Sequence, residues 1–424
     1  MKYTDDALGK LWASQTVDSD YCHRGISPAE RAAGAIMGML IGDALGQGCL
    51  WYYQFEQLWE DYGDWVDNYQ NPKAIDSGCD FDAIANYRYR RGLRAGYNSQ
   101  SGQLAQLLLE TVAASKRDGA SGFVPERYFQ AVNKFFAREL LPDLNMGLAE
   151  RPKSDYMFKV YEQNNLGRKN GIHCFAGRYS DEVVRDAFDA WYDQGTMSGQ
   201  WWKKGGSPTS TSDAAQWGVI LSTLYDDPHQ LFMVAYDFCH YWFSVEGFIS
   251  TTIVYIMTVQ AIINGIPIGD IGDYLLDTFN DLGVIDRKIC SYDDAFGNAF
   301  VLYRTLSKPQ FFQLQDDRFI SQIYGMDCHV VNLMPAAYYL AYKYATDFEQ
   351  GILFAVNSGG NNMARSALTG GLLGAMNGLS AIPPRFIHGL DNFPQQIPAP
   401  YKQQGKYLSD LAKYVTADVG YGKD

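Results

Sequence analysis

Apolar positions recur along the chain at the three- and four-residue spacing of amphipathic helices. A leucine-rich stripe from Leu104 to Val112 has this spacing, and the segments 352–356 and 368–376 repeat it on either side of a glycine-rich break. We find no run of alternating apolar and polar residues bounded by hairpin turns. The pattern therefore predicts an all-α protein.

The segment Ser27-Pro28-Ala29-Glu30 predicts the start of a helix. Ser followed three residues later by Glu is a capping box, and Pro at the first helical position fits it. The helix that follows carries Gly34 and Gly38, although glycine in a helix interior costs about 1 kcal/mol relative to alanine. We expect these glycines to let another helix approach closely.

Two further helices are indicated in the middle of the chain. Asp227-Pro228 is a turn signal before LFMVAYDFCHYWF, which predicts a long helix. The most apolar long stretch, Phe248 to Ile263, is shorter than 18 residues and contains three threonines. We interpret it as a buried core helix and expect no membrane span.

The length of 424 residues allows two or three domains, but the pattern favours fewer. We predict one helical domain over residues 1–393, with a divergent, loop-rich, insertion-like region at 116–209. The proline-rich PQQIPAP stretch then leads, over residues 394–424, to a C-terminal helix packed on that domain.

The formal net charge of −13 argues against a nucleic-acid partner, because an acidic surface repels phosphate backbones. Aromatic residues make up 15% of the chain, including 30 Tyr, which favours an aromatic core over a stacking pocket. The seven cysteines are scattered without a CxxC pair, which suits reduced thiols. The N-terminus lacks a signal-peptide pattern, so we expect a cytoplasmic protein.

Three polar, glycine-containing segments are the candidates for chemistry: Gly42–Gly46 (GDALG), Tyr97–Ala105 and Asn357–Arg365. Each has a structural interpretation, because Asp43 could bond a backbone turn, and Ser99 or Ser101 could cap a helix. Gly359-Gly360 could likewise end a helix in the left-handed conformation. Converging polar helix N-termini, however, are typical of a site for an anion such as a diphosphate.

These segments resemble the ADP-ribosylglycohydrolases, including the dinitrogenase-reductase-activating type. RAAGAIMGMLIGDALG resembles the N-terminal helix and GDALG signature of that family. The stretch 96–110 is similar to its TDDTQLA segment, and 330–383 to its C-terminal GGDxDT segment with the flanking helices. The resemblance spans roughly residues 27 to 390.

The resemblance implies a compact, multi-helix fold and a specific chemistry. Active members of the family bind two Mg²⁺ through aspartates of the second and third segments. They hydrolyse the N- or O-glycosidic bond that joins ADP-ribose to a protein side chain. Hard cations prefer such oxygen ligands, and bound metals can orient a water and stabilise developing charge.

The departures from the family lie at the metal positions. Thr-Asp-Asp-Thr is replaced here by Ser99-Gln100-Ser101-Gly102, and Gly-Gly-Asp-x-Asp-Thr by Gly359-Gly360-Asn361-Asn362-Met363-Ala364. Amide oxygens are weak neutral ligands, and a thioether does not suit Mg²⁺. We therefore predict that Mg²⁺ binding is lost and that no cofactor is used.

Two further family positions differ. The acidic residue that follows GDALG in the family is Leu50 here, and Ser212-Asp213 lies where the family has a mid-chain segment that holds the diphosphate. The predicted ligand-binding, degenerate cleft therefore consists of Asp43, Leu50, Ser99, Gln100, Ser101, Ser212, Asp213, Gly359, Gly360, Asn361, Asn362 and Met363.

Our leading hypothesis is a catalytically degenerate family member that binds ADP-ribose, an ADP-ribosylated protein or a protein partner. One form of it is an immunity protein that blocks an ADP-ribosylating toxin, since some bacterial relatives have that role and an acidic surface suits a basic partner.

Two other hypotheses remain open. One is an active glycosidase that uses relocated carboxylates or no metal, for which short Asp clusters at 76–82 and 293–294 are the candidates, although such clusters usually form turns. The other is a structural homologue without a small ligand, in which Leu50 and Met363 fill the former metal cavity.

Overall fold

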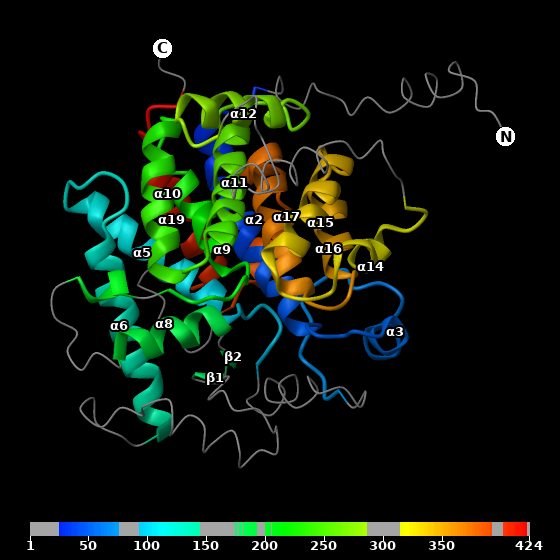
Figure 1. Ribbon diagram of the computed structural model, residues 1–424. Coiled ribbons are helices and arrows are strands. Elements are labelled where there is room, and N and C mark those ends of the chain that lie inside the picture. The colour runs from blue at the N-terminus through cyan, green and yellow to red at the C-terminus, as the bar shows by residue number, and fades with distance from the viewer. Residues whose placement is uncertain are drawn as a thin grey trace, which may run out of the picture.

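The computed structural model describes residues 25–75, 93–144, 174–175, 178–179, 181–192, 200–204, 206–285, 314–391 and 402–421. The described chain is built from α-helices packed around two central ones, α2 (Pro28–Gly48) and α17 (Asn362–Asn377) (Figure 1). This confirms the predicted all-α class. The other α-helices are α3 (Phe55–Tyr62), α5 (Gln100–Arg117), α6 (Pro125–Leu144), α8 (Glu182–Tyr192), α9 (Asp213–Ser222), α10 (Pro228–Trp242), α11 (Glu246–Ile263), α12 (Ile271–Asp281), α14 (Ile320–Tyr324), α15 (Val330–Lys343), α16 (Phe348–Val356), α18 (Pro384–Gly389) and α19 (Gln404–Thr416).

The remaining elements are short. Three 3₁₀ turns are described, η3 (Trp201–Lys204), η5 (Asp317–Phe319) and η6 (Leu379–Ala381). Strands β1 (Cys174–Phe175) and β2 (Arg178–Tyr179) pair antiparallel, with Cys174 opposite Tyr179. A two-residue pair of this kind does not change the fold class.

The crossing of α2 and α17 explains the glycines of the first helix. A Cβ atom on Gly34 would lie 2.3 Å from the carbonyl oxygen of Gly374, and one on Gly38 would lie 2.1 Å from that of Gly370. The same holds for Gly42, which faces the backbone of Ser366 at 2.0 Å. The predicted close helix approach is confirmed, and α17 is its partner.

The predicted start of α2 is confirmed in part. The Oγ of Ser27 accepts a hydrogen bond from the backbone N–H of Glu30 at 3.2 Å, as an N-cap should. The carboxylate of Glu30 does not complete a capping box, because it accepts from the backbone N–H of Ser380 at 2.6 Å. Glu30 therefore ties the start of α2 to η6.

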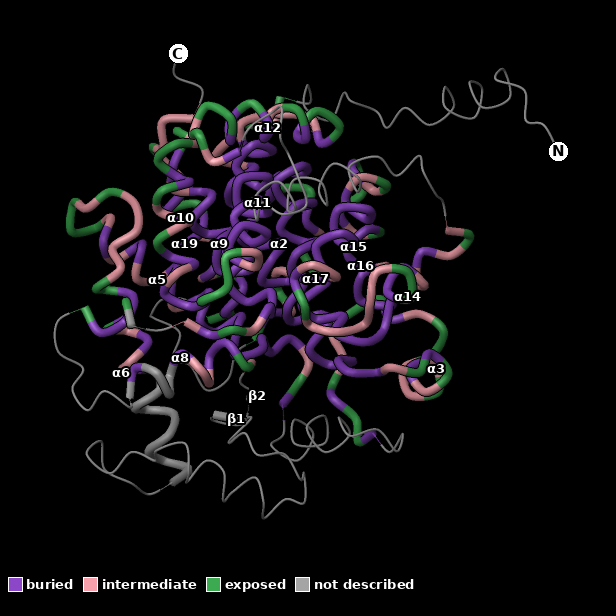
Figure 2. Tube along the Cα trace, viewed as in Figure 1, coloured by how far each residue is buried: buried purple, intermediate pink, exposed green. Residues whose placement is uncertain are grey.

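A layer formed by α9, α11 and α15 covers one side of the central pair, and its residues are largely buried (Figure 2). Every residue of α11 from Ile249 to Ile263 is buried, as predicted for a core helix. By length and composition alone, α11 is the single helix of the described ranges that could cross a membrane, and 83% of it is buried inside the fold.

The described parts of the 116–209 region pack on this core through aromatic rings. Phe129 of α6 stacks on Trp202 with a centroid distance of 5.7 Å, and Trp191 of α8 meets Trp201 edge-on at 5.0 Å. Trp242 of α10 joins the same cluster and lies 4.4 Å from Trp217 of α9. The rings thus connect α6, α8 and η3 to the helices that carry the candidate site.

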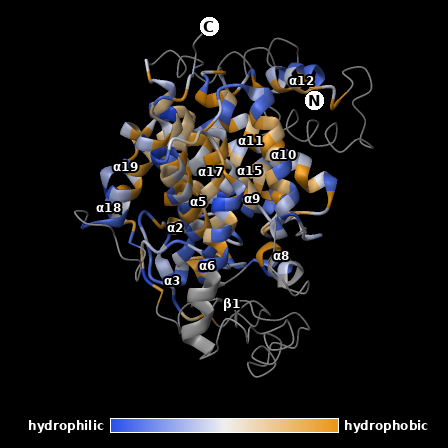
Figure 3. Ribbon diagram, turned by 90° about the vertical axis from the view of Figure 1, so that its left-hand side faces the viewer, coloured by the Kyte–Doolittle hydropathy of each residue, from blue (hydrophilic) through white to orange (hydrophobic). Residues whose placement is uncertain are grey.

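Apolar residues are gathered in the central helices, such as α17 and α11, whereas peripheral helices such as α12 and α18 are more hydrophilic (Figure 3). The C-terminal α19 packs on α2 and α5 with Leu408 and Leu411 buried. The division of the chain at residue 393 stays a prediction.

Candidate functional site

Asp43 of α2 organises the first part of the candidate site. Its carboxylate is fully buried and accepts hydrogen bonds from the Nδ2 of Asn98 at 2.7 Å, the backbone N–H of Ser99 at 2.8 Å and the Oγ of Ser99 at 2.5 Å. A Cβ atom on Gly102 would lie 2.3 Å from the same carboxylate, so glycine is required there. Asp43 therefore holds the start of α5 against α2, which is its structural interpretation.

Asn98 extends this network to the backbone of α2 and to a side chain of α5. Its Nδ2 also donates to the backbone oxygen of Leu40 at 2.8 Å, and its Oδ1 accepts from the Nε2 of Gln106 at 2.7 Å. Asn98 lies within the indicated segment Tyr97–Ala105 but is not among the predicted cleft residues, and Gln106 lies just beyond that segment. Gln106 is eight residues beyond Asn98. Sequence alone does not distinguish a buried glutamine at such a position from one on the surface of the helix.

The N-terminus of α5 presents the residues that stand at the second family segment. Ser99 is its N-cap, with its Oγ accepting from the backbone N–H of Gly102 at 3.1 Å, as one structural interpretation expected. Gln100 is buried, yet both polar atoms of its amide are without a hydrogen-bond partner in the described structure. Ser101 is buried too, and its Oγ donates a hydrogen bond to the carboxylate of Asp213.

The third segment is held beside α2 by backbone pairing. The N–H of Gly360 donates to the carbonyl of Tyr52 at 2.7 Å, and the N–H of Trp51 donates to the carbonyl of Gly360 at 2.9 Å. Gly359 and Gly360 both have positive φ values, of 61° and 59°, which glycine adopts without strain. The loop after GDALG and the Gly-Gly loop are therefore joined by backbone hydrogen bonds, and Leu50 is buried beside them.

The residues at the third family segment are used structurally. The Oδ1 of Asn361 caps α17 by accepting from the N–H of Ala364 at 3.3 Å. The Nδ2 of Asn362 donates to the carbonyl oxygens of Cys49 at 3.1 Å and Val356 at 2.8 Å. Met363 is buried in the same apolar cluster as Leu50, as the cavity-filling hypothesis requires.

This donor set does not fit a pair of Mg²⁺ ions. The positions offer the amides of Gln100 and Asn361, the hydroxyl of Ser101 and the thioether of Met363, with no carboxylate among them. Magnesium requires hard, preferably charged oxygen ligands in octahedral geometry. No metal-dependent step can therefore be assigned to these residues.

Two carboxyl groups lie close to Ser101. Asp213, the first residue of α9, is buried, and its charge acts on the pKa of the partly exposed Asp181, which directly precedes α8. Burial raises the pKa of both groups, and for Asp181 the nearby charges of Asp213 and Asp43 raise it further. The pair therefore retains a proton above the usual range for aspartate.

Asp213 was indicated by its position in the sequence, but Asp181 was not. Asp181 lies in the 116–209 region, where no motif or periodic pattern singles it out. The neighbouring Ser212 precedes α9 and is buried, and its side chain makes no capping hydrogen bond. The Asp clusters at 76–82 and 293–294 lie outside the described residues.

The segment that precedes α15 pairs with the segment that precedes α9. The backbone N–H of Val330 donates to the carbonyl of Ser210 at 2.7 Å, and the Nδ1 of His329 contacts the Oγ of Ser210. This pairing places Cys328 near the acid pair. Burial first, and then the charges of Asp181 and Asp213, raise the pKa of the Cys328 thiol well above its ordinary value, so it stays protonated.

A buried cation completes the surroundings. Arg365 of α17 is fully buried, and its guanidinium donates to the carbonyl oxygens of Gly359 at 2.9 Å and Gly325 at 3.3 Å. Burial lowers its pKa to about 10, so it remains charged at neutral pH. Arg365 therefore ties the Gly-Gly loop to α17 through its hydrogen bond to the carbonyl oxygen of Gly359.

The comparisons with known proteins agree with this arrangement. A sequence model of the ADP-ribosylglycohydrolase family matches residues 25–420. A solved structure of an ADP-ribosylglycohydrolase-related protein complex shares the fold, with a TM-score of 0.54 and 16% sequence identity, over 92% of this chain and 98% of that one. No curated protein matches the sequence. On the family match, which covers nearly the whole chain, the protein belongs to the ADP-ribosylglycohydrolase family.

Proposed function

We propose that this chain is a catalytically degenerate member of its family that binds an ADP-ribosyl group without cleaving it. The observation that carries the proposal is the contrast between backbone and side chains at the two helix N-termini. Both α5 and α17 begin beside α2, while Gln100, Ser101, Asn361 and Met363 stand where the family places aspartates. The binding architecture is retained and the metal chemistry is not.

The charge of the site supports binding without metal. Aspartates at these positions would repel one another and the ligand's diphosphate unless Mg²⁺ were present to neutralise them. Neutral side chains remove that repulsion, and helix N-termini carry a partial positive charge that favours anions. A diphosphate can therefore approach these helices without a cation.

The carrier of the ADP-ribosyl group is proposed to be a protein. The net charge of −13 favours fast encounter with a basic partner. One form of this proposal is an immunity protein that blocks an ADP-ribosylating toxin. The solved neighbour is described as a protein complex, but its 16% identity extends only the fold to this chain.

A thermal-shift measurement with ADP-ribose, in EDTA and in Mg²⁺, tests the proposal. Stabilisation follows RT ln(1 + [L]/Kd), which is about 2.7 kcal/mol when the ligand is at a hundred times Kd. We expect the same rise in Tm with and without Mg²⁺, and no rise with ribose alone as the control. A rise that requires Mg²⁺, or no rise at millimolar ADP-ribose, would contradict the proposal.

The Asp181–Asp213 pair favours a second candidate, a hydrolase with relocated carboxylates. One protonated and one ionised carboxyl group suit general acid–base catalysis. Glycoside hydrolases, however, separate their two carboxyl groups by about 5–10 Å to flank the sugar. Asp213 is 2% exposed and accepts a hydrogen bond from Ser101, so its carboxylate is not open to a sugar.

An activity assay separates the two candidates. Release of free ADP-ribose from an ADP-ribosylated protein should be undetectable for the wild-type chain under the binding proposal. Activity that is independent of Mg²⁺ and is lost in Asp213→Asn would instead establish the hydrolase.

A further inference from the structure

The first turns of α5 and α17 lie against neighbouring positions of α2. The carboxylate of Asp43 in α2 accepts from the backbone N–H of Ser99, the N-cap of α5, at 2.8 Å. A Cβ atom on Gly46 of α2 would lie 2.3 Å from the Cα of Met363, in the first turn of α17. Asp43 and Gly46 are three residues apart, which is about 4.5 Å along a helix axis. The two helix starts are therefore neighbours along α2.

Each of these helices begins with a buried amide that is not fully hydrogen-bonded. Gln100, the first residue of α5, is 1% exposed, and neither its Oε1 nor its Nε2 has a partner in the described part of the chain. The Nδ2 of Asn362, the first residue of α17, donates to the carbonyl oxygens of Cys49 and Val356. The Oδ1 of Asn362 is buried and likewise has no partner among the described residues. Such atoms are rare in folded proteins and cost stability, so they require an explanation.

A second glutamine of α5 is fully bonded. Gln106 is also 1% exposed, and its Nε2 donates to the Oδ1 of Asn98 at 2.7 Å. Its Oε1 accepts from the Nε2 of Gln404 at 3.5 Å. The helix can therefore satisfy a buried glutamine, and the unbonded amide of Gln100 is specific to the helix start at the candidate site.

The unbonded atoms define the chemistry of a complementary ligand. Gln100 offers a donor group and an acceptor, and Asn362 offers a second acceptor. A metal ion would leave the Nε2 of Gln100 unbonded, and a phosphate, which only accepts, would leave both oxygens unbonded. A hydroxyl group both donates and accepts, so two neighbouring hydroxyls of a sugar can bond all three atoms.

We propose that Gln100 and Asn362 bind a vicinal diol of ribose directly, by hydrogen bonds and without a metal. The inference rests on the proposed function, because an ADP-ribosyl group contains two such diols, one on the adenosine and one on the terminal ribose. The free protein is less stable because these atoms are unbonded, and the ligand bonds them. Both amides are closed to solvent, so side chains over them move when the ligand enters.

Gln100→Met tests the cost of the unbonded amide in the absence of ligand. Methionine is also long and unbranched but has no donor, so the substitution removes the unbonded atoms. We expect the folding equilibrium constant, measured by urea unfolding of the full chain, to rise about tenfold. Gln106→Met is the matched control in the same helix, and it should lower this constant because it breaks existing hydrogen bonds. A constant that is unchanged or lower in Gln100→Met would overturn the proposal, because Gln100 would then be bonded in the free protein, for example by a buried water.

Titration of the full chain in EDTA with three nucleotides identifies the diol. 2′,3′-Dideoxy-ADP has neither diol, ADP adds the adenosine diol, and ADP-ribose adds that of the terminal ribose. We expect one of these two additions to strengthen binding about tenfold in wild type and in Gln106→Met, but not in Gln100→Met. The charge difference between the nucleotides is the same for all three proteins and cancels in the comparison.

The outcomes separate this inference from the function on which it rests. If wild type does not bind ADP-ribose, the proposed function and the diol site both fail. If ADP-ribose binds but Gln100→Met weakens neither addition, only the diol site is overturned. Equal affinity of wild type for all three nucleotides would also overturn it, and that comparison does not depend on whether Gln100→Met folds.

Discussion

At the residue scale, the candidate site has a carboxylate at Asp43 but neutral side chains at the positions where the family has metal-binding aspartates. Asp43 keeps its carboxylate and uses it to bond Asn98 and Ser99. Gln100 and Ser101 keep the buried positions without the charge. The carboxylate of Asp43 therefore holds α5 against α2, and that of Asp213 accepts a hydrogen bond from Ser101.

Asp43→Asn tests the structural part of this account. The substitution turns an acceptor of three hydrogen bonds into a group that presents N–H toward donors, which leaves buried polar atoms unsatisfied. We expect the free energy of unfolding in urea to fall by about 2 kcal/mol. Asp118→Asn at the exposed end of α5 is the control and should change it by less than about 0.5 kcal/mol. Equal effects of the two variants would show that Asp43 has no special structural role.

The sequence indicates these residues unevenly. The replaced positions 100, 101, 361 and 363 could be named because their segments resemble those in which the family places its metal-binding aspartates. Asp181 could not be predicted, because only folding brings it near Asp213 of α9 and its own segment has no periodic pattern. Polar partners from such segments are visible only once the chain is folded.

At the element scale, the α2–α17 crossing positions both ends of the site. The close approach of Gly34, Gly38 and Gly42 to α17 brings the segment that follows α2 beside the Gly-Gly loop. The need for a partner helix was predictable from glycine spacing, since glycine is otherwise costly in a helix. That α17 is the partner was not, because four-residue spacing of small residues does not specify what packs against it.

Gly38→Ala tests the crossing. The added Cβ would lie 2.1 Å from the backbone oxygen of Gly370, and a backbone atom cannot move aside as a side chain can. We expect a loss of about 3 kcal/mol in the free energy of unfolding. Gly247→Ala in α11 meets nothing within 4 Å and should instead add about 0.5 kcal/mol through helix propensity. A tolerated Gly38→Ala would contradict the packing described.

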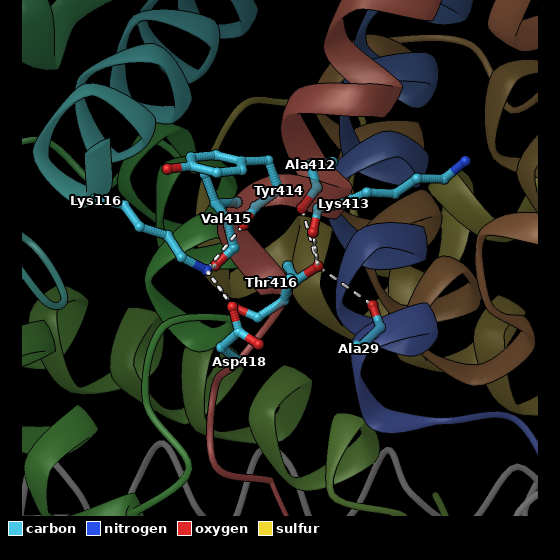
Figure 4. Close-up of polar contacts among 9 residues, drawn as sticks. Ala29, Lys116, Ala412, Lys413, Tyr414, Val415, Thr416 and Asp418 are labelled. Carbon is cyan, nitrogen blue, oxygen red and sulfur yellow. Dashed lines mark hydrogen bonds and ion pairs between the residues drawn. The ribbon is translucent and has the colours of Figure 1, made fainter. Parts of the chain in front are cut away.

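At the scale of the whole molecule, the C-terminal helix closes the fold by contact with an early one. The Nζ of Lys116, at the end of α5, donates to the carbonyl oxygens of Tyr414 at 2.9 Å and Ala417 (Figure 4). Lys116 thereby caps the end of α19, and its positive charge offsets the partial negative charge at the C-terminal end of that helix. Residues 298 to 301 positions apart in sequence are joined here, which no local pattern could predict.

Lys116→Met tests this closure. The methionine keeps the apolar stem but removes the charge and the donors, so we expect the free energy of unfolding to fall by about 1 kcal/mol. Lys413→Met is the matched control, because that side chain points away from Lys116 (Figure 4) and is exposed. A loss of stability that is as large for Lys413→Met would show that the cap does not matter.

The net charge of the whole molecule contrasts with the neutral side chains in the candidate site. The chain has 48 acidic residues, yet the side chains are neutral at the four positions, 100, 101, 361 and 363, where the family has metal-binding aspartates. The charge of −13 is therefore interpreted as a property of the surface that influences solubility and the choice of partner.

Calorimetric titration of EDTA-treated, full-length protein with Mg²⁺ tests the central claim most directly. Because the donors at positions 100, 101, 361 and 363 carry no charge, the account predicts no saturable heat of binding at micromolar Mg²⁺. Two-site binding with micromolar affinity would contradict it and would return the protein to the metal-dependent hydrolases of its family.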